Sequence, residues 1–375
     1  MWVSKVKRWL TALTGIALLA NVGGATAEWG MNLRPGVTPI SQQAYDLHML
    51  IMWICVAIGV VVFGIMFISI IKHRKSKGAK PATFHESTTV EIIWTIVPFL
   101  ILIGMAIPAT KALIAMENTS NPDLTIKVTG YQWKWGYDYL DDGVSFMSTL
   151  TTPKEQILGQ QDLGENYLLE VDNPVVIPVD KKVRLLITAN DVIHAWWVPD
   201  FGMKKDAIPG FVNDMWIKAD TEGTYRGQCA ELCGKDHGFM PIVVEVKNEA
   251  DYQQWLVAQK AAMDADAAGA DRDWSMAELM ERGEKVYTTS CAACHQANGE
   301  GVPGAFPGLK GSALTIGPVG AHLDIVMNGK PGTAMAAFGG QLNDIDLAAV
   351  VTYERNSWGN DVGDLIQPSE VKAAR

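Results

Sequence analysis

Two stretches of this chain are long and apolar enough to cross a lipid bilayer. The segment Met49–Ile71 contains no charged side chain, and Ile92–Thr110 is also uncharged. About 20 apolar residues in a helix span the hydrocarbon core of a membrane. We therefore expect residues 28–117 to form a two-helix transmembrane hairpin in a lipid bilayer, with helices at about residues 48–71 and 91–113. A buried helical hairpin of a soluble protein is the alternative.

The segment between these two stretches is basic, which indicates the orientation of the hairpin. Against a single acid, Glu86, it carries Lys72, Arg74, Lys75, Lys77 and Lys80. Loops rich in Lys and Arg stay on the cytoplasmic side of a membrane. Both ends of this multi-pass anchor, and all soluble parts of the chain, are therefore expected on the periplasmic side of a bacterial inner membrane.

The N-terminus has the pattern of a secretory signal peptide. A basic start and a short apolar core precede a small-residue cleavage site; these are Lys5, Lys7 and Arg8, then Leu10–Val22, then Ala25–Ala27. That order of regions is typical of a cleaved export signal. We expect residues 1–27 to be removed after Ala27. A third membrane helix is the alternative, against which the short apolar core argues.

The residue pattern of the remaining chain changes twice. Residues 118–250 contain short runs rich in Val, Ile, Thr and aromatic side chains, separated by Pro, Gly, Asn and Asp, which predicts an antiparallel β-sandwich or barrel. Residues 251–274 indicate a helix followed by a small, acidic linker, Asp264–Asp273. Residues 275–360 show a helical pattern with Gly- and Pro-rich loops, which predicts an all-α domain, and residues 361–375 are expected to be a tail.

The charge of the chain limits the partners that we expect. It carries 41 acidic against 31 basic side chains, a formal net charge of −10. Nucleic acid is therefore not an expected partner, and a basic protein is favoured over a polyanion.

Cys291, Cys294 and His295 form a C-x-x-C-H motif, the attachment pattern of a c-type haem. The two thiols form thioether bonds to the porphyrin, and the adjacent imidazole becomes an axial ligand of the iron. A thioredoxin-like redox pair and half of a zinc site are the alternatives. No βαβ pattern supports the first, and no second Cys pair supports the second. The sequence therefore predicts one covalently bound haem c.

The second axial ligand of that haem has three candidates. Met335 lies in a Gly- and Pro-rich segment that can fold over the haem face, and a Met ligand suits electron transfer. Met327 lies in a helical pattern, where we expect a packing residue. His322 is the remaining candidate and is expected at the surface. We favour Met335.

A second group of ligands precedes the haem motif. Cys229, Cys233, His237 and Met240 lie within twelve residues, and His194 at the end of a strand pattern is a distant fifth donor. A zinc site would take four tetrahedral Cys and His ligands. A blue copper site takes two His, one Cys and a weak Met. The present set has two Cys, one thiolate more than such a site uses. Two thiolates can instead bridge two copper ions, each capped by one His.

This pattern resembles the binuclear CuA site of cytochrome c oxidase subunit II. The resemblance extends over roughly residues 30–250 and includes the two-helix anchor and the segments Glu91–Thr95, Tyr131–Trp135 and Asp206–Gly210. It implies a cupredoxin-like fold for the all-β domain. The C-terminal all-α domain resembles the cytochrome c domain that some bacterial subunit II proteins carry as a fusion.

The resemblance also implies a role for each ligand. Cys229 and Cys233 would bridge the two coppers, and His194 and His237 would cap them. Met240 would be one weak axial ligand and the Glu231 carbonyl oxygen the other. The Glu231 carboxylate would contact a magnesium ion shared with subunit I.

Two further residues acquire roles from the resemblance. Trp133 would lie where electrons enter the copper domain, the alternative being a half-buried strand aromatic. Glu91, at the cytoplasmic end of the second membrane helix, would form the mouth of a proton channel into subunit I. An acid at that depth is costly unless it is useful, and an interfacial carboxylate hydrated by lipid headgroups is the alternative.

The implied function is that of subunit II of a bacterial terminal oxidase, active only in complex with subunit I and, we expect, subunit III. Reduced cytochrome c or another periplasmic donor would supply electrons to the haem. They would pass through CuA to subunit I, where oxygen is reduced to water with proton translocation. A CuA-bearing nitric oxide reductase subunit and a free-standing, membrane-anchored electron carrier are the alternatives.

Overall fold

The computed structural model describes residues 32–80 and 83–375. The expected signal peptide, residues 1–27, lies outside the described residues. All of the helices and strands described below belong to one compact unit, Pro35–Arg375.

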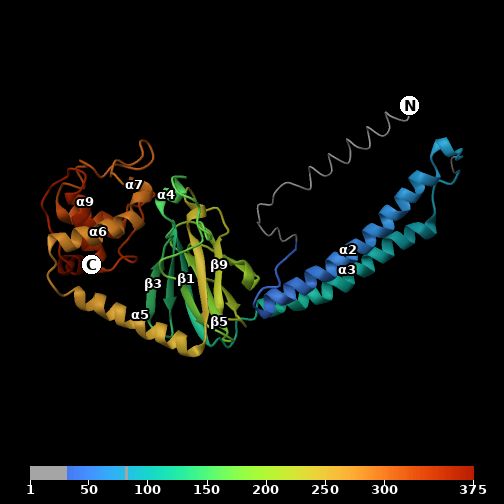
Figure 1. Ribbon diagram of the computed structural model, residues 1–375, viewed down its shortest axis with the longest axis horizontal. Coiled ribbons are helices and arrows are strands. Elements are labelled where there is room, and N and C mark those ends of the chain that lie inside the picture. Colours follow the sequence, from blue (N-terminus) through green and yellow to red (C-terminus); the bar gives the residue numbers. More distant parts are fainter. Residues whose placement is uncertain (1–31, 81–82) are drawn as a thin grey trace, which may run out of the picture. The chain divides into compact units, whose positions relative to one another are not determined.

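Two long helices, α2 (Pro39–Lys72) and α3 (Thr88–Met116), contact each other and are joined through the short 3₁₀ helix η1 (Lys75–Lys77) (Figure 1). Helix α2 begins well before its apolar stretch, because Thr38 forms a capping box there and Pro39 occupies the first turn. Both helices are long and apolar enough to cross a membrane, and their apolar side chains point outward. Exposed apolar surface of this extent marks an interaction site or a membrane-facing surface.

The central part of the chain is a sandwich of two five-stranded sheets, with the orders β3-β2-β1-β5-β8 and β4-β10-β9-β6-β7. The short helices around it are α4 (Lys154–Ile157), η2 (Pro199–Phe201) and η3 (His237–Phe239). The strands are β1 (Leu124–Tyr131), β2 (Lys134–Tyr139), β3 (Val144–Ser148), β4 (Val175–Pro178), β5 (Val183–Ala189), β6 (His194–Val198), β7 (Met203–Ala207), β8 (Asn213–Ile217), β9 (Gly223–Cys229) and β10 (Pro241–Lys247).

The expectation of purely antiparallel pairing is wrong for two strand pairs. Strand β1 runs parallel to β5, and β4 runs parallel to β10. Neither pair consists of neighbours in the sequence, so neither is joined by a tight hairpin turn, which only antiparallel strands can use. The period-2 pattern of the sequence reports strands and their buried faces, but not which strands pair.

Aromatic side chains of the sandwich core contact the residues at the start of β6 and after the end of β9. Trp135 and Trp196 are both almost fully buried. The Trp135 Nε1 donates to the carbonyl oxygen of Met240 at 3.2 Å, and its ring lies 5.9 Å from the His194 ring. The rigid aromatic core therefore contacts the segments that carry the predicted metal ligands.

Helix α5 (Glu249–Gly269) follows the sandwich directly. Its N-terminal half buries Tyr252 and Leu256 in the core of the sandwich. Residues 264–269, expected as the first part of a linker, continue this helix instead. They are rich in Ala, which has the highest helix propensity, and Asp266 accepts hydrogen bonds from Arg282 and Asn343 in the next domain.

The C-terminal domain is all helical and consists of α6 (Met276–Ser290), α7 (Ala292–His295), α8 (Val319–Asn328), α9 (Asp344–Asn356) and α10 (Pro368–Ala374). Helices α6 and α9 cross closely at Gly283, where an added Cβ would lie 2.1 Å from the Ala349 carbonyl oxygen. The expected tail, residues 361–375, contains α10, whose Val371 is buried in the core of this domain.

Candidate metal centre

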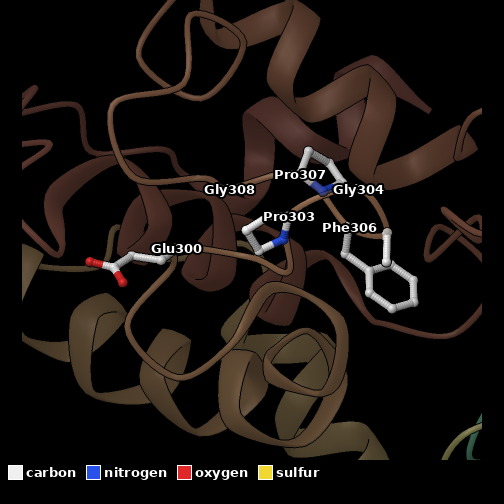
Figure 2. Close-up of a pocket in the computed structure, with 7 residues that line it drawn as sticks. Glu300, Pro303, Gly304, Phe306, Pro307 and Gly308 are labelled. Atoms are coloured by element: carbon white, nitrogen blue, oxygen red, sulfur yellow. The ribbon is translucent and has the colours of Figure 1, made fainter.

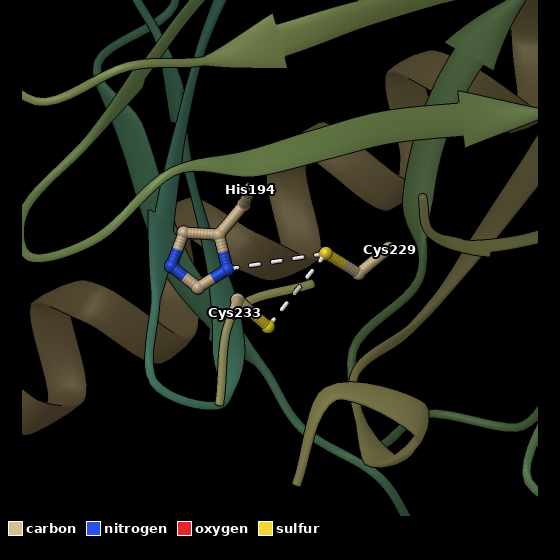
Figure 3. Close-up of side chains that lie close together, drawn as sticks. All are labelled: His194, Cys229 and Cys233. Atoms are coloured by element: carbon tan, nitrogen blue, oxygen red, sulfur yellow. Dashed lines mark hydrogen bonds between the residues drawn. The ribbon is translucent and has the colours of Figure 1, made fainter. Parts of the chain in front are cut away.

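His194, Cys229 and Cys233 come together at one end of the sandwich (Figure 3). The Cys229 Sγ lies 3.9 Å from the Cys233 Sγ and 3.9 Å from the His194 Nδ1. Pairing of β6 with β9 creates this approach, because it sets Trp196 opposite Cys229. All three side chains are buried, and the two sulfurs are far beyond the bond length of a disulfide, about 2.05 Å.

The loop after β9 brings in the other predicted ligands. The Cys233 Sγ lies 3.4 Å from the His237 Nδ1 and 3.5 Å from the Met240 Sδ. The Glu231 carbonyl oxygen lies 3.3 Å from the Cys229 Sγ, while the side chain of Glu231 is exposed. The structure therefore gathers all six predicted ligand residues around the two cysteine sulfurs, with one imidazole nitrogen near each sulfur.

The chemistry of these donors fits a pair of copper ions. Two thiols, two imidazoles and a thioether are soft or borderline donors, whereas calcium and magnesium take oxygen ligands. A hydrogen bond between the thiols lowers the pKa of Cys229 and raises that of Cys233, so one thiolate forms before any metal arrives. The bound ions would displace the remaining proton, because a coordinating thiol is deprotonated.

A carboxylate that the sequence analysis missed holds His194 in place. The His194 Nε2 lies 2.9 Å from Asp191 Oδ1, and Asp191 Oδ2 accepts from the Gln132 backbone N–H at 2.8 Å. Burial lowers the pKa of His194, but the hydrogen bonds with Asp191 and Cys229 outweigh burial and raise it overall. The only sequence signal for Asp191 is its position three residues before the predicted ligand His194, in a turn.

Trp133 contacts the loop of predicted ligands, residues 229–240, through its ring nitrogen. Trp133 Nε1 and Gln132 Nε2 both donate to the Cys233 carbonyl oxygen, at 3.2 and 2.8 Å. Gly234 makes room for them: its φ is +117°, and an added Cβ would lie 2.9 Å from Gln132 Nε2 and 3.1 Å from the Trp133 ring. The half-buried indole is therefore hydrogen-bonded to a residue that would bridge the coppers.

Glu91 lies in the first turn of α3. Its backbone oxygen accepts a hydrogen bond from Thr95 Oγ1 at 2.8 Å. Glu91 is exposed on this helix.

The haem-attachment motif occupies the end of α6 and the short helix α7. The His295 Nδ1 lies 2.8 Å from the Pro307 carbonyl oxygen, which leaves Nε2 free as the nitrogen that would bind iron. Burial raises the pKa of Cys291 and of Cys294, which keeps both thiols protonated. Neither thiol is in a disulfide, as a thioether link to a porphyrin requires.

A shallow pocket of about 360 Å³ lies along the loop that holds His295 (Figure 2). It is lined by residues 300 and 303–308, including Phe306 and Pro307. Within the described part of the chain, none of the four predicted haem-binding residues lines this pocket. The pocket therefore lies along the loop that supports His295 and does not mark the predicted position of the haem.

The candidates for the second axial ligand differ in their surroundings. Met335 is half-buried in the loop between α8 and α9, where its carbonyl oxygen accepts from the Lys330 N–H at 3.0 Å. Met327 is buried in the core of the helical domain. The expectation that His322 lies at the surface is wrong: it is 2 % exposed, and its Nε2 lies 2.9 Å from Glu354 Oε2. Its amphipathic helix α8 turns this residue inward against α9.

Each part of the chain is similar to a known protein family. Residues 124–247 match the family model described as cytochrome c oxidase subunit II, periplasmic domain, and residues 26–112 match the transmembrane domain of the same subunit. Residues 278–353 match the model described as cytochrome c oxidase, cbb3-type, subunit III.

Individual relatives agree with these matches. A probable cytochrome c oxidase subunit 2 of Rickettsia prowazekii is 39% identical over 265 residues, which is 69% of this chain and 83% of that relative. Cytochrome c oxidase subunit 2 of Arabidopsis thaliana is 40% identical over 63% of this chain and 91% of that relative. A crystal structure of the periplasmic domain of subunit II of cytochrome oxidase from Bradyrhizobium japonicum is 43% identical, with a TM-score of 0.35, over 38% of this chain and 98% of that one.

Proposed function

Because this chain belongs to the cytochrome c oxidase subunit II family, with a cytochrome c domain at its C-terminal end, we propose that it joins a periplasmic electron donor to an oxygen-reducing subunit. It would accept electrons at a haem c and pass them through a copper pair to subunit I. There oxygen is reduced to water with proton translocation. The two-helix anchor would place both soluble domains on the periplasmic side of a bacterial inner membrane.

One observation supports the proposal most directly: two free, buried thiols 3.9 Å apart, each with an imidazole nitrogen beside it. When bound, the copper pair and the haem supply one-electron redox chemistry. The chain's own residues hold and orient those groups. Cys229 and Cys233 would hold the copper pair through their sulfurs, His194 and His237 through their imidazoles, and Met240 and the Glu231 carbonyl oxygen as weaker ligands.

The burial of this site has a chemical consequence. Cys229 and Cys233 are only 4 % and 2 % exposed, and His194 is fully buried. Water is thereby kept from these three side chains, and the aromatic core that contacts them resists movement. A site that changes little in geometry is suited to rapid electron transfer, because little reorganisation accompanies each change of redox state.

The haem would be held by Cys291, Cys294 and His295, with Met335 as the second axial ligand. The hydrogen bond between His295 Nδ1 and the Pro307 carbonyl oxygen supports this role, because it leaves Nε2 as the nitrogen that would bind iron. The core position of Met327 and the Glu354 partner of His322 favour Met335 as the free ligand.

Three further roles belong to the same proposal. The exposed carboxylate of Glu231 would bind a magnesium ion shared with subunit I. Trp133 would lie on the path into the copper pair, through its hydrogen bond to the Cys233 carbonyl oxygen. Glu91, in the first turn of α3, would deliver protons into subunit I. Subunit III is an expected neighbour.

The test is to purify the full-length chain in detergent and record its electron paramagnetic resonance spectrum, with metal analysis. We expect hyperfine structure from two equivalent coppers that share one unpaired electron, two coppers per chain, and one haem that stays attached under denaturing conditions. A single-copper spectrum, or zinc in place of copper, would refute the copper-pair proposal. Loss of the haem on denaturation would refute covalent attachment.

A further inference from the structure

We propose that Lys134 and Lys235 dock the haem-attachment segment, residues 290–295, on the copper-ligand loop, residues 229–240, so that the copper pair receives its electrons from the chain's own haem domain. The inference rests on the proposed function and adds the surface across which the electron passes. It also assigns two positioning residues, neither of which is an expected ligand.

Lys235 connects the two motifs directly. Its Nζ donates to the Ala293 carbonyl oxygen at 3.1 Å. Ala293 lies inside the haem motif, between Cys291 and Cys294, and Lys235 follows Cys233 by two residues. A continuous path of covalent bonds and one hydrogen bond therefore joins the expected haem-attachment motif to an expected copper ligand.

Lys134 makes a second contact beside the first. It follows Trp133, whose ring nitrogen donates to the Cys233 carbonyl oxygen. The Lys134 Nζ lies 3.5 Å from Ser290 Oγ and 5.3 Å from the centre of the Phe338 ring. Ser290 immediately precedes Cys291, and Phe338 follows Met335 by three residues. Lys134 thus contacts both segments that carry the expected haem-binding residues.

The burial of Lys134 shows that this contact is closed to water. Its side chain is only 4 % exposed, although a buried ammonium group is costly unless it is paired. An aromatic face within about 6 Å of an ammonium group supplies part of that compensation. Burial lowers the pKa of Lys134 to about 8.

Helix α5 restrains the same arrangement from another side. Its N-terminal half is buried in the sandwich core through Tyr252 and Leu256. At its other end, Asp266 accepts from Asn343 Nδ2 at 3.1 Å, and the Gly269 carbonyl oxygen accepts from Trp274 Nε1 at 2.8 Å. A continuous helix anchored in both domains is a stiff connection, unlike a flexible small-residue linker.

With both groups bound, one electron would leave the ferrous haem iron, which would become ferric, and the oxidised copper pair would gain that electron. No covalent bond forms or breaks, and no proton is required. A periplasmic donor then needs to reduce only the haem domain. The electron would pass from there to the copper domain across the contacts that Lys134 and Lys235 make with the haem-attachment segment.

The experiment uses the purified oxidase complex with both cofactors present. One arm labels lysine amines with an acetylating reagent and locates the products by mass spectrometry. The other arm reduces the haem with a light pulse and a soluble photoreductant, then follows the copper absorbance. Lys235→Glu and Lys134→Met are compared with Lys181→Glu, an exposed lysine at the opposite end of β5 from the copper ligands.

We expect Lys134 to be labelled much more slowly than Lys181. Lys235→Glu should slow copper reduction by about tenfold without slowing haem reduction. The reason is that loss of one charge-assisted hydrogen bond lowers the fraction of molecules in which the haem-attachment segment is docked. Lys181→Glu should have no effect. Equal labelling of all three lysines, with an unchanged rate in Lys235→Glu, would overturn the docking proposal. The copper spectrum and the covalent haem, recorded on the same samples, test the proposed function separately.

Discussion

The imidazole of His194 is held by the carboxylate of Asp191, whose Oδ1 lies 2.9 Å from the ring Nε2. Asp191 Oδ2 in turn accepts from the backbone N–H of Gln132, which precedes Trp133. With Nε2–H donated to the carboxylate, Nδ1, which lies 3.9 Å from the Cys229 Sγ, is the nitrogen that would bind copper. One carboxylate therefore selects the tautomer of a predicted ligand and joins it to the segment that contacts Cys233.

Asp191→Asn should weaken copper binding while leaving the chain folded. An amide can no longer accept two strong hydrogen bonds from His194 and Gln132, and removing such a partner of a metal-binding His lowers metal affinity by about 10- to 100-fold. Competition with a copper chelator measures this change, and the copper hyperfine pattern should change with it. Asp162→Asn, on an exposed loop, is the matched control; equal affinity in both variants would contradict the assignment.

Cys233→Ser should abolish the two-copper spectrum. With a single thiolate left at Cys229, no second sulfur can bridge two ions, and the chain should bind at most one copper per site. Metal analysis and electron paramagnetic resonance check this outcome. Cys55→Ser, at an exposed position on α2, should keep both coppers. An intact two-copper spectrum in Cys233→Ser would rule out this residue as a bridge.

Gly234→Ala should destabilise the copper-ligand loop by about 1–3 kcal/mol, the cost of a strained backbone conformation. The φ of Gly234 is +117°, and its new methyl group would also press on Gln132 and Trp133. Gly238→Ala lies in the same loop with open space around it and should be nearly neutral. Thermal unfolding of the two metal-free variants measures the difference, and equal midpoints would argue against this role for Gly234.

The stability of the chain should depend on the ionisation of Lys134. Burial lowers its pKa from 10.5 to about 8 in the folded protein. Between these values the unfolded chain binds more protons than the folded one, so the free energy of unfolding should rise with pH from about 8 to 10.5. Below about pH 8 this residue should contribute no pH dependence.

Lys134→Met should remove that rise and leave the pH dependence of all other groups in place. The comparison is therefore the difference in unfolding midpoint between wild type and variant at several pH values from 7 to 10. A constant difference across that range would show that Lys134 titrates normally in the folded chain.

Spacing in the sequence was enough to predict which residues lie together wherever those residues are close to one another along the chain. The two apolar stretches indicated membrane helices because length and composition alone decide that property. Cys229, Cys233, His237 and Met240 share one loop, and Cys291, Cys294 and His295 share one turn. For such groups a short segment brings the donors together almost regardless of the surrounding fold.

Tertiary structure decided the features that depend on strand pairing and domain contact. His194 reaches Cys229 only because β6 pairs with β9. Asp191 lies in the turn before β6, and this turn places its carboxylate beside His194. The parallel pairing of β1 with β5 and the burial of His322 against Glu354 follow from long-range contacts. The proximity of Lys134 and Lys235 to the haem motif is of the same kind. A sequence pattern records which face of each element is apolar, whereas the partner of that face is selected by the free energy of the whole folded chain.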